Sequence, residues 1–138
     1  MFKNILVPVD LSEENKAALS LAVQMAAPSQ GTVTLLHVIE TIAGAEFMEI
    51  KDFYVTLEKK AQSGMEGLLA GLPDATGVKT KIVFGNRVGE ILKFAVERKC
   101  DLIVLASHRI RPEEPVSGWG TISYKVGILA QCPVLLVK

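Results

Sequence analysis

Five short apolar runs divide the chain, and polar or turn residues bound each of them. The runs are Asn4–Val9, Thr32–Ile39, Val78–Phe84, Asp101–Ala106 and Pro133–Val137. Runs of this length that are rich in Val, Ile and Leu predict β-strands buried on both faces. The run at 78–84 alternates polar and apolar residues, so we expect it to lie nearer a sheet edge.

Between these runs, apolar residues recur at helical spacing. The stripes span Ala18–Ala26, Tyr54–Leu72 and Val88–Val96, and a fourth helix is expected to start near Gly120. Asp10 with Glu13 predicts a capping box for the first helix. Asn86 predicts the cap of the third helix. Residues 40–53 show no clear period and predict a long excursion with at most one helical turn.

Strands that alternate with helices, without tandem hairpins, predict an α/β fold with right-handed parallel crossovers. We predict one domain, residues 1–138, with an open, doubly wound (Rossmann-like) sheet of five parallel strands in the order 3-2-1-4-5 and helices on both faces. The first and fourth runs are the most apolar, which places them at the centre. Their carboxyl ends should lie side by side, where open α/β sheets bind ligands.

The net charge and the length of the apolar runs argue against nucleic-acid and membrane partners. The 138 residues carry 15 basic and 15 acidic side chains, a formal net charge of zero that gives no general attraction to nucleic acid. The apolar runs are shorter than the roughly 18–20 residues of a membrane-spanning helix. Without a signal-peptide pattern or a disulfide framework, we expect a cytoplasmic protein that does not enter a membrane.

Motifs of common enzymes are absent from the sequence. There is no GxxxxGK[ST] loop, no GxGxxG after the first strand and no GxSxG elbow. Cys100 and Cys132 lack a CxxC partner or clustered histidines, so we expect no metal site. The adjacent Glu113 and Glu114 lie in a proline-flanked loop that would hold them poorly for catalysis. We therefore expect no catalytic residues.

Several segments together resemble the universal stress protein family. They are KNILVPVDLSEEN, LLHVIE, GNRVGEIL, CDLIVLASHR and GTISYKVGILAQCPVLLVK, which cover most of the chain in the family's order. The resemblance implies a homodimer of α/β subunits, some members of which bind ATP. In those members the aspartate matching Asp10 lies near the nucleotide and the strand around Val38 lines the adenine pocket.

The family's phosphate loop reads Gly, two residues, Gly, nine residues, Gly, then Ser or Thr. Here Ala106 and Arg109 stand at the first two glycine positions, and ten residues separate Arg109 from the intact Gly120–Thr121. Glycine permits positive φ and close approach of a phosphate, whereas arginine offers only its guanidinium. The amides that open the fourth helix remain a fair anion site.

The candidate nucleotide contacts lie on the first, second and fourth strands and at the start of the last helix. They are Pro8, Val9, Asp10, Val38, Ala106, Ser107, His108, Arg109, Gly118, Gly120, Thr121, Ile122 and Ser123. Purely structural roles remain open for some of these residues and for His37. Asp10, Thr121 and Ser123 could cap helices, Arg109 could be a solvated charge, and His37 could be a strand residue packed under a helix.

The last strand is expected at a sheet edge, where an apolar strand invites pairing. Antiparallel pairing with a second copy would cover Pro133, Val134, Leu135, Leu136 and Val137 by two-fold symmetry.

Three functions remain open. The leading one is a non-catalytic, homodimeric stress-response protein with weak or absent adenine-nucleotide binding and no required cofactor. The second is a true ATP-binding member, a nucleotide-gated switch or slow hydrolase that holds ATP with Mg²⁺, or AMP. The third is a ligand-free module that docks an unidentified protein through residues 40–53.

Overall fold

The computed structural model describes residues 1–42, 50–72, 77–107 and 119–138, without the side chains of residues 119–121. The strands are β1 Asn4–Pro8, β2 Thr32–Glu40, β3 Val78–Gly85, β4 Leu102–Ala106 and β5 Val134–Val137. The helices are α1 Asn15–Ala26, α2 Lys51–Ala70, α3 Arg87–Glu97 and α4 Trp119–Leu129, with a 3-10 turn, η1, at Ala27–Ser29. No helix within these ranges is long and apolar enough to cross a membrane.

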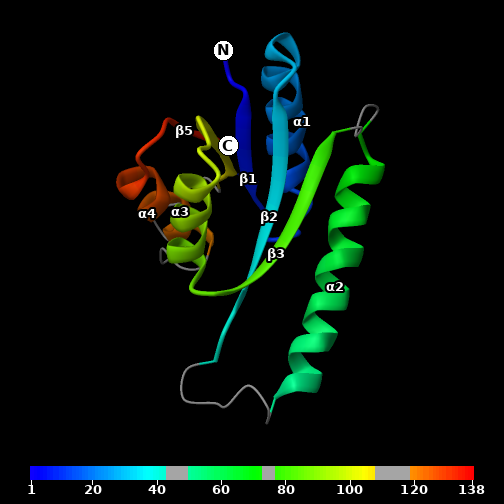
Figure 1. The fold of residues 1–138 in the computed structure, drawn as a ribbon. Helices are drawn as coiled ribbons and strands as arrows, with labels where there is room; N and C mark the ends of the chain where they lie inside the picture. Colours follow the sequence, from blue (N-terminus) through cyan, green and yellow to red (C-terminus); the bar gives the residue numbers. More distant parts are fainter. Residues whose placement is uncertain (43–49, 73–76, 108–118) are drawn as a thin grey trace.

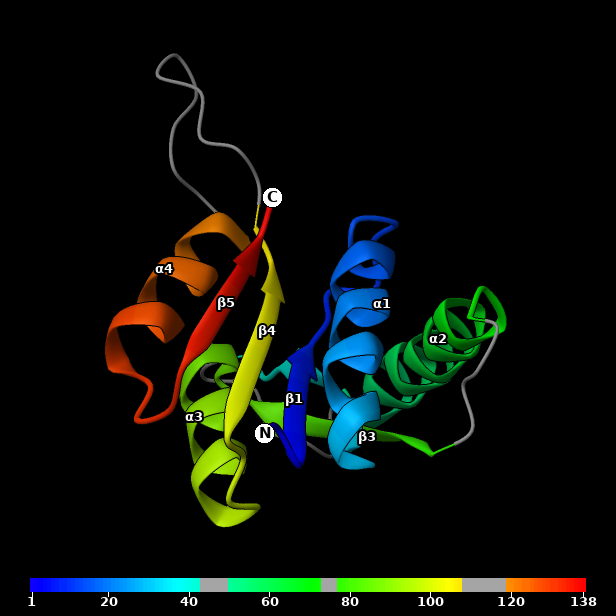
Figure 2. The same cartoon turned by 90° about the horizontal axis from the view of Figure 1, so that it is seen from above.

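The five strands form one parallel sheet in the order β3-β2-β1-β4-β5, which confirms the predicted topology. Figure 1 shows α2 packed beside β3, and Figure 2 shows α1 and α2 on one face of the sheet and α3 and α4 on the other. Strand β1 is central because it pairs with both β2 and β4.

Two apolar clusters hold these layers together, one on each face of the sheet. Alternate residues of β1 divide between them: Ile5 and Val7 join α1 and α2, whereas Leu6 joins α3 and α4. All three side chains are fully buried. This explains why the run at 4–9 is apolar throughout, since neither face of a covered parallel strand meets water.

The ladder between β1 and β4 is short, and Pro8 supplies the reason. Pairing is recorded only at Ile5↔Leu102 and Leu6↔Ile103. The amide of Val9 donates to Leu36 O of β2 at 2.9 Å, so the alternating backbone turns the nitrogen of Pro8 toward β4. Proline has no N–H to donate, and the two central strands are therefore free to separate at their carboxyl ends.

The predicted capping box of the first helix is wrong. Helix α1 begins at Asn15, and Asp10 Oδ1 instead accepts hydrogen bonds from Ser12 N at 3.0 Å and from Asn15 Nδ2. Glu13 forms an ion pair with Lys16 at 2.7 Å. The carboxylate thus closes a tight turn rather than capping a helix, because Asn15 lies fully buried beneath it.

That turn contains a strained residue, and Gly64 makes room for it. Leu11 has φ of 71°, a left-handed conformation that costs a leucine roughly 1–2 kcal/mol. Its side chain packs against α2, where a methyl group on Gly64 would lie 3.1 Å from Leu11 Cδ1. The helix-weakening glycine at 64 is explained by this contact, whereas Gly67 faces open space.

The structure confirms the predicted cap of α3 and corrects the predicted start of α2. Asn86 caps α3 as predicted, because its Oδ1 accepts from Gly89 N at 2.9 Å. The excursion prediction is wrong at its end, since α2 already begins at Lys51; residues 43–49 lie outside the described ranges. Tyr54 draws the ends of that segment together, because its hydroxyl accepts from Ile42 N at 2.8 Å and its ring meets Phe84 edge-on at 5.6 Å.

Alanine substitutions should separate the two glycines of α2. Gly67→Ala is expected to raise the free energy of unfolding by about 0.5–1 kcal/mol, because alanine is the better helix former and meets nothing there. Gly64→Ala should gain less or destabilise, because its methyl presses on Leu11. Urea unfolding measures both; equal stabilisation would contradict the role given to the Leu11 contact.

Asn15→Ala should destabilise the protein by about 2 kcal/mol, because a buried hydrogen-bond partner of a carboxylate is lost. Ser12→Ala removes the hydroxyl that accepts from Asn15 Nδ2 at 2.9 Å and that also hydrogen-bonds Asp10, but it keeps the bond from Asn15 to Asp10, so it is the milder control at about 0.5–1 kcal/mol. Similar losses for the two variants in urea unfolding would show that Asn15 does not organise this turn.

Candidate nucleotide crevice

The candidate nucleotide crevice lies at the carboxyl edge of the sheet, beyond the ends of β1 and β2. Three consecutive parallel strands, β3, β2 and β1, end at this edge, and α3 begins there. A small cavity lies between them, lined by Val9, Asp10, Leu36, His37, Val38, Arg87 and Ile91. Water has access to only about 30 Å³ of it, which is room for one or two molecules.

The floor of this cavity is apolar. Val9, Val38 and Ile91 are exposed by 1%, 5% and 1%. Side chains of this kind accept the flat face of a nucleobase, but here Val38 and Ile91 already pack in the core on the α3 face, and Val9 packs in the core on the α1 face. A purine would therefore have to displace them, and displacing close-packed side chains costs contact energy.

His37 ties the strands together beneath the crevice. Its Nδ1 lies 2.9 Å from the carbonyl oxygen of Val9, so Nδ1 carries the hydrogen of this bond. In the neutral ring, Nε2 is left as an acceptor. The packing interpretation of His37 fits this bond, which holds the end of β1 to β2 beyond the last paired residues.

Arg87 is a cavity residue that the candidate set did not include. It is the first residue of α3, and its Nε lies 3.8 Å from Glu40 Oε1 at the end of β2. The ion pair is half-exposed and worth little stability. The topology itself is the signal that could have found Arg87, since the residue after a parallel strand lies at the ligand edge.

Asp10 is ionised and internally bonded. Burial alone would raise the pKa of this carboxyl, but hydrogen bonds from the Ser12 side chain and backbone and from Asn15 outweigh burial and lower the pKa from its ordinary value. Asp10 therefore stays negative at neutral pH. It offers acceptor oxygens at the mouth of the cavity, where they would suit hydroxyl donors better than phosphates.

The structure brings together some of the predicted contacts. Val9, Asp10 and Val38 line one cavity, and Pro8 stands at its inner end. Ala106 is instead buried in the core on the α1 face, and the Ser107 amide donates to Val137 O at 2.8 Å.

The remaining predicted contacts lie on α4 or beyond the described ranges. Ile122 and Ser123 are 8% and 1% exposed on α4, and Ile122 packs in the same core cluster as Val38 and Ile91. Gly120 and Thr121 belong to the first turn of α4, where the backbone alone is described. His108, Arg109 and Gly118 lie outside the described residues.

The possible metal ligands and the two cysteines were compared with what a metal site or a reactive thiol requires. In the described part of the chain, no three His, Cys, Asp or Glu side chains gather as metal ligands. Cys100 and Cys132 are free thiols. Burial, followed by the neighbouring Cys132 and Asp101, raises the pKa of Cys100 to about 11, so its reactive thiolate is scarce at neutral pH.

The chain is similar in sequence and fold to several universal stress proteins. Universal stress protein YxiE of Bacillus subtilis is 29% identical over 150 residues, covering 100% of both chains. The solved structure of MJ0577 of Methanocaldococcus jannaschii has a TM-score of 0.76 at 31% identity and covers 100% of this chain and 96% of that one. The structure of UspA from Lactobacillus plantarum has a TM-score of 0.75 at 28% identity, with 99% and 98% covered.

Two more distant structures share the fold and contain adenine nucleotides. A universal stress protein in complex with cAMP has a TM-score of 0.66 at 20% identity, covering 99% of this chain and 97% of its own. The Archaeoglobus fulgidus protein in complex with dAMP has a TM-score of 0.61 at 21% identity, with 99% and 98% covered. The model of the universal stress protein family matches residues 1–138, the whole of the sequence. The chain belongs to the universal stress protein family.

Proposed function

We propose that this protein is a non-catalytic, homodimeric stress-response protein of the cytoplasm whose crevice binds adenine nucleotides weakly or not at all. The main support for this proposal is the small size of the cavity between Val9, Val38 and Ile91, of which only about 30 Å³ is accessible to water. The fold retains the family's crevice, and distant relatives with cAMP and dAMP show that this fold holds adenine nucleotides. In this chain the buried side chains of Val9, Val38 and Ile91 leave too little space for a nucleobase.

The phosphate side supports the same proposal. Ala106 carries a buried methyl group where the family has glycine, and arginine replaces the second glycine at 109. A micromolar ligand needs about 8 kcal/mol of binding free energy. The dipole of α4 supplies at most about 2 kcal/mol, so base burial and amide contacts would have to provide the rest.

The second candidate, a true ATP-binding member, is favoured by Arg87. Its guanidinium stands at the cavity beside a half-exposed glutamate and could turn toward phosphate instead. Magnesium would then be held by the phosphates and water, as is usual for this ion. The third candidate, docking through residues 40–53, rests on a segment of which residues 43–49 lie outside the described residues.

Freshly purified protein should release far less than one equivalent of ATP, ADP or AMP on denaturation, as measured by mass spectrometry. Adding Mg-ATP to about its dissociation constant, at millimolar concentration, should stabilise the fold by only about 0.4 kcal/mol. Recovery of near-stoichiometric nucleotide would instead identify the protein as an ATP-binding member.

A cavity-enlarging variant tests why binding is weak. Val38→Ala should strengthen ATP binding several-fold, because it opens the floor of the cavity. Val104→Ala is the matched control, since it removes the same two carbons from a fully buried residue in the cluster on the opposite face. Titration by thermal shift compares the two; an unchanged affinity in Val38→Ala would show that packing at the base position is not the limit.

The dimer is expected to form through β5. This strand is the last of the sheet, and its four residues are only half-buried in one chain. The Val137 and Pro133 carbonyls accept hydrogen bonds from β4, so the alternating backbone points the amides of Val134 and Leu136 outward. Those donors are available for an antiparallel partner strand.

Leu136→Pro should shift the protein toward monomer, because it deletes an outward amide and leaves the bonds to β4. Leu136→Ala is the control that keeps the amide while also losing side-chain packing. Analytical ultracentrifugation at micromolar protein concentration measures the fraction of dimer. A wild-type monomer, or equal dissociation of both variants, would refute backbone pairing through β5.

A further inference from the structure

A second cavity, remote from the crevice, gathers basic and hydroxyl side chains. It lies toward the amino ends of β1, β2 and β3 on the α3 face, with about 390 Å³ open to water. Its lining is Lys3, Asn4, Thr32, Thr34, Lys79, Thr80, Lys81, Phe94 and Arg98. The volume falls in the range of small-molecule sites, about 300–1,000 Å³.

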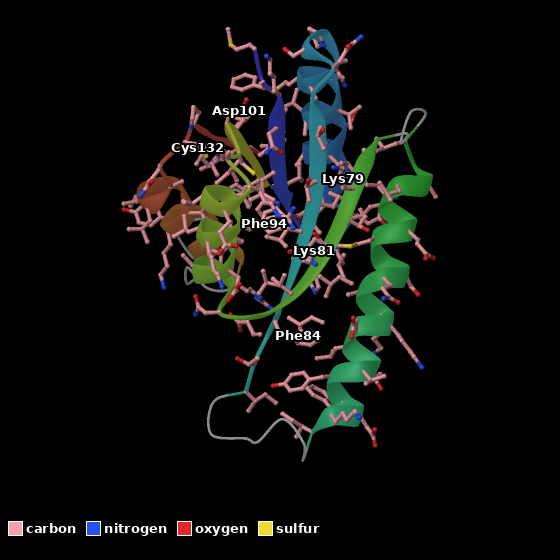
Figure 3. The ribbon with its side chains drawn as sticks, viewed as in Figure 1. Lys79, Lys81, Phe84, Phe94, Asp101 and Cys132 are labelled. Atoms are coloured by element: carbon pink, nitrogen blue, oxygen red, sulfur yellow. The ribbon has the colours of Figure 1, made fainter. Side chains whose placement is uncertain are left out.

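The sheet register makes this lining contiguous. Asn4 of β1 pairs with Thr32 of β2, and Thr34 of β2 pairs with Lys79 of β3. Paired residues on neighbouring strands lie about 5 Å apart, and Lys81 follows Lys79 on the same face about 7 Å along the strand. Figure 3 labels Lys79 and Lys81 along β3 and Phe94 on α3, with β2 running between them.

The positions of these polar residues are unusual for a covered sheet. Leu36, Val38 and Val83 continue the same face of β2 and β3 toward the carboxyl edge, where they pack against α3. The amino half of that face carries threonine and lysine instead, and Thr34 is only 8% exposed. A polar floor under a cavity is what a polar ligand requires, and an apolar one would have served packing better.

Over the described ranges, no carboxylate forms an ion pair with the cations of this cavity. Within the described residues, ion pairs join only Lys16 to Glu13 and Arg87 to Glu40. The nearby Asp101 carboxylate accepts from the backbone amides of Lys3 at 2.8 Å and Asn4 at 3.1 Å. Four cations therefore face one cavity in a protein whose formal net charge is zero.

Arg98 is positioned for anion recognition. Its guanidinium carbon lies 5.4 Å from the centre of the Phe94 ring, a cation–π contact that limits its rotamers. Its carbonyl accepts from Asn4 Nδ2, which occupies an acceptor at the carboxyl end of α3 that would otherwise face an anion. A guanidinium held in this way can form paired hydrogen bonds with a phosphate.

We propose that this cavity, the basic groove, binds a small molecule that carries two or more phosphate groups. Lys79 and Lys81 would hold one end, and Arg98 with Lys3 the other. The threonine hydroxyls between them supply neutral donors to the bridging region. Glu58 and Glu66 line a neighbouring cavity on the α2 side of β3, which shares Thr80 and Lys81 with the basic groove.

Inorganic tripolyphosphate is the probe, titrated by calorimetry into the full chain at about 50 mM salt, where exposed charges are only partly screened. Saturable binding with a dissociation constant below about 1 mM is expected, and orthophosphate should bind at least about tenfold more weakly, because one phosphate cannot reach both ends. Backbone NMR shifts should change at Thr34, Lys79 and Phe94.

Lys79→Gln with Lys81→Gln should weaken tripolyphosphate at least about tenfold, because two charge-assisted contacts are lost. Lys59→Gln with Lys60→Gln removes the same charge from exposed sites on α2 and should change affinity less than about twofold. Arg87→Gln, at the crevice, should likewise leave binding intact. All variants alter exposed or half-exposed side chains, and circular dichroism checks their folding.

Four outcomes would overturn the proposal. The first is absence of saturation by tripolyphosphate. The second is equal weakening in the two lysine pairs, which would show unspecific charge attraction. The third is loss with Arg87→Gln, which would place the anion in the crevice. The fourth is competition by a single-stranded oligonucleotide at lower concentration than tripolyphosphate, which would indicate a macromolecular polyanion. Without binding, Lys79 and Lys81 serve only to protect an edge strand.

Discussion

The absent N–H of Pro8 is the constraint on which the carboxyl edge of this sheet depends. Because the nitrogen of Pro8 faces β4 and cannot donate, the recorded pairing between the two central strands ends at Leu6 and Ile103. The chain must then turn into α1 without the support of a continuing ladder. Asp10, Ser12 and the buried Asn15 provide that support through side-chain hydrogen bonds. The strained Leu11 and the glycine that accommodates it follow from the same sharp turn.

The crevice and the basic groove lie at opposite ends of the strands. At the crevice, Val38 and Ile91 pack in the core on the α3 face and Val9 in the core on the α1 face, so a nucleobase would have to displace side chains that stabilise the fold. Any ligand that enters must offset lost contacts, whereas a ligand of the basic groove would meet an open and already polar surface. If the proposed basic groove binds phosphate, a universal stress domain of this shape would keep the family's architecture and attract phosphate at a second place in the sheet.

Much of the fold was predictable because its signals are local. Apolar runs of strand length, helical stripes and the Asn86 cap each depend on a few neighbouring residues, and the structure confirms them. The capping box failed because a local motif, Asp10 with Glu13, competed with a tertiary one. Asn15 is drawn into the core, and its side chain takes the carboxylate that would have capped the helix. No spacing rule reveals that an asparagine in a polar stretch is fully buried.

Some residues of the candidate sites could likewise be predicted from the sequence, and others could not. Val9, Asp10 and Val38 could be placed together from strand order alone, because carboxyl ends of parallel strands share an edge. The basic groove could not, because its members come from separate elements whose side chains meet only through register and helix packing. The sequence by itself determined the family, the strand order and the zero net charge. Only the tertiary structure decided where that charge is concentrated and how little space is left for a base, since both depend on side chains far apart in the chain.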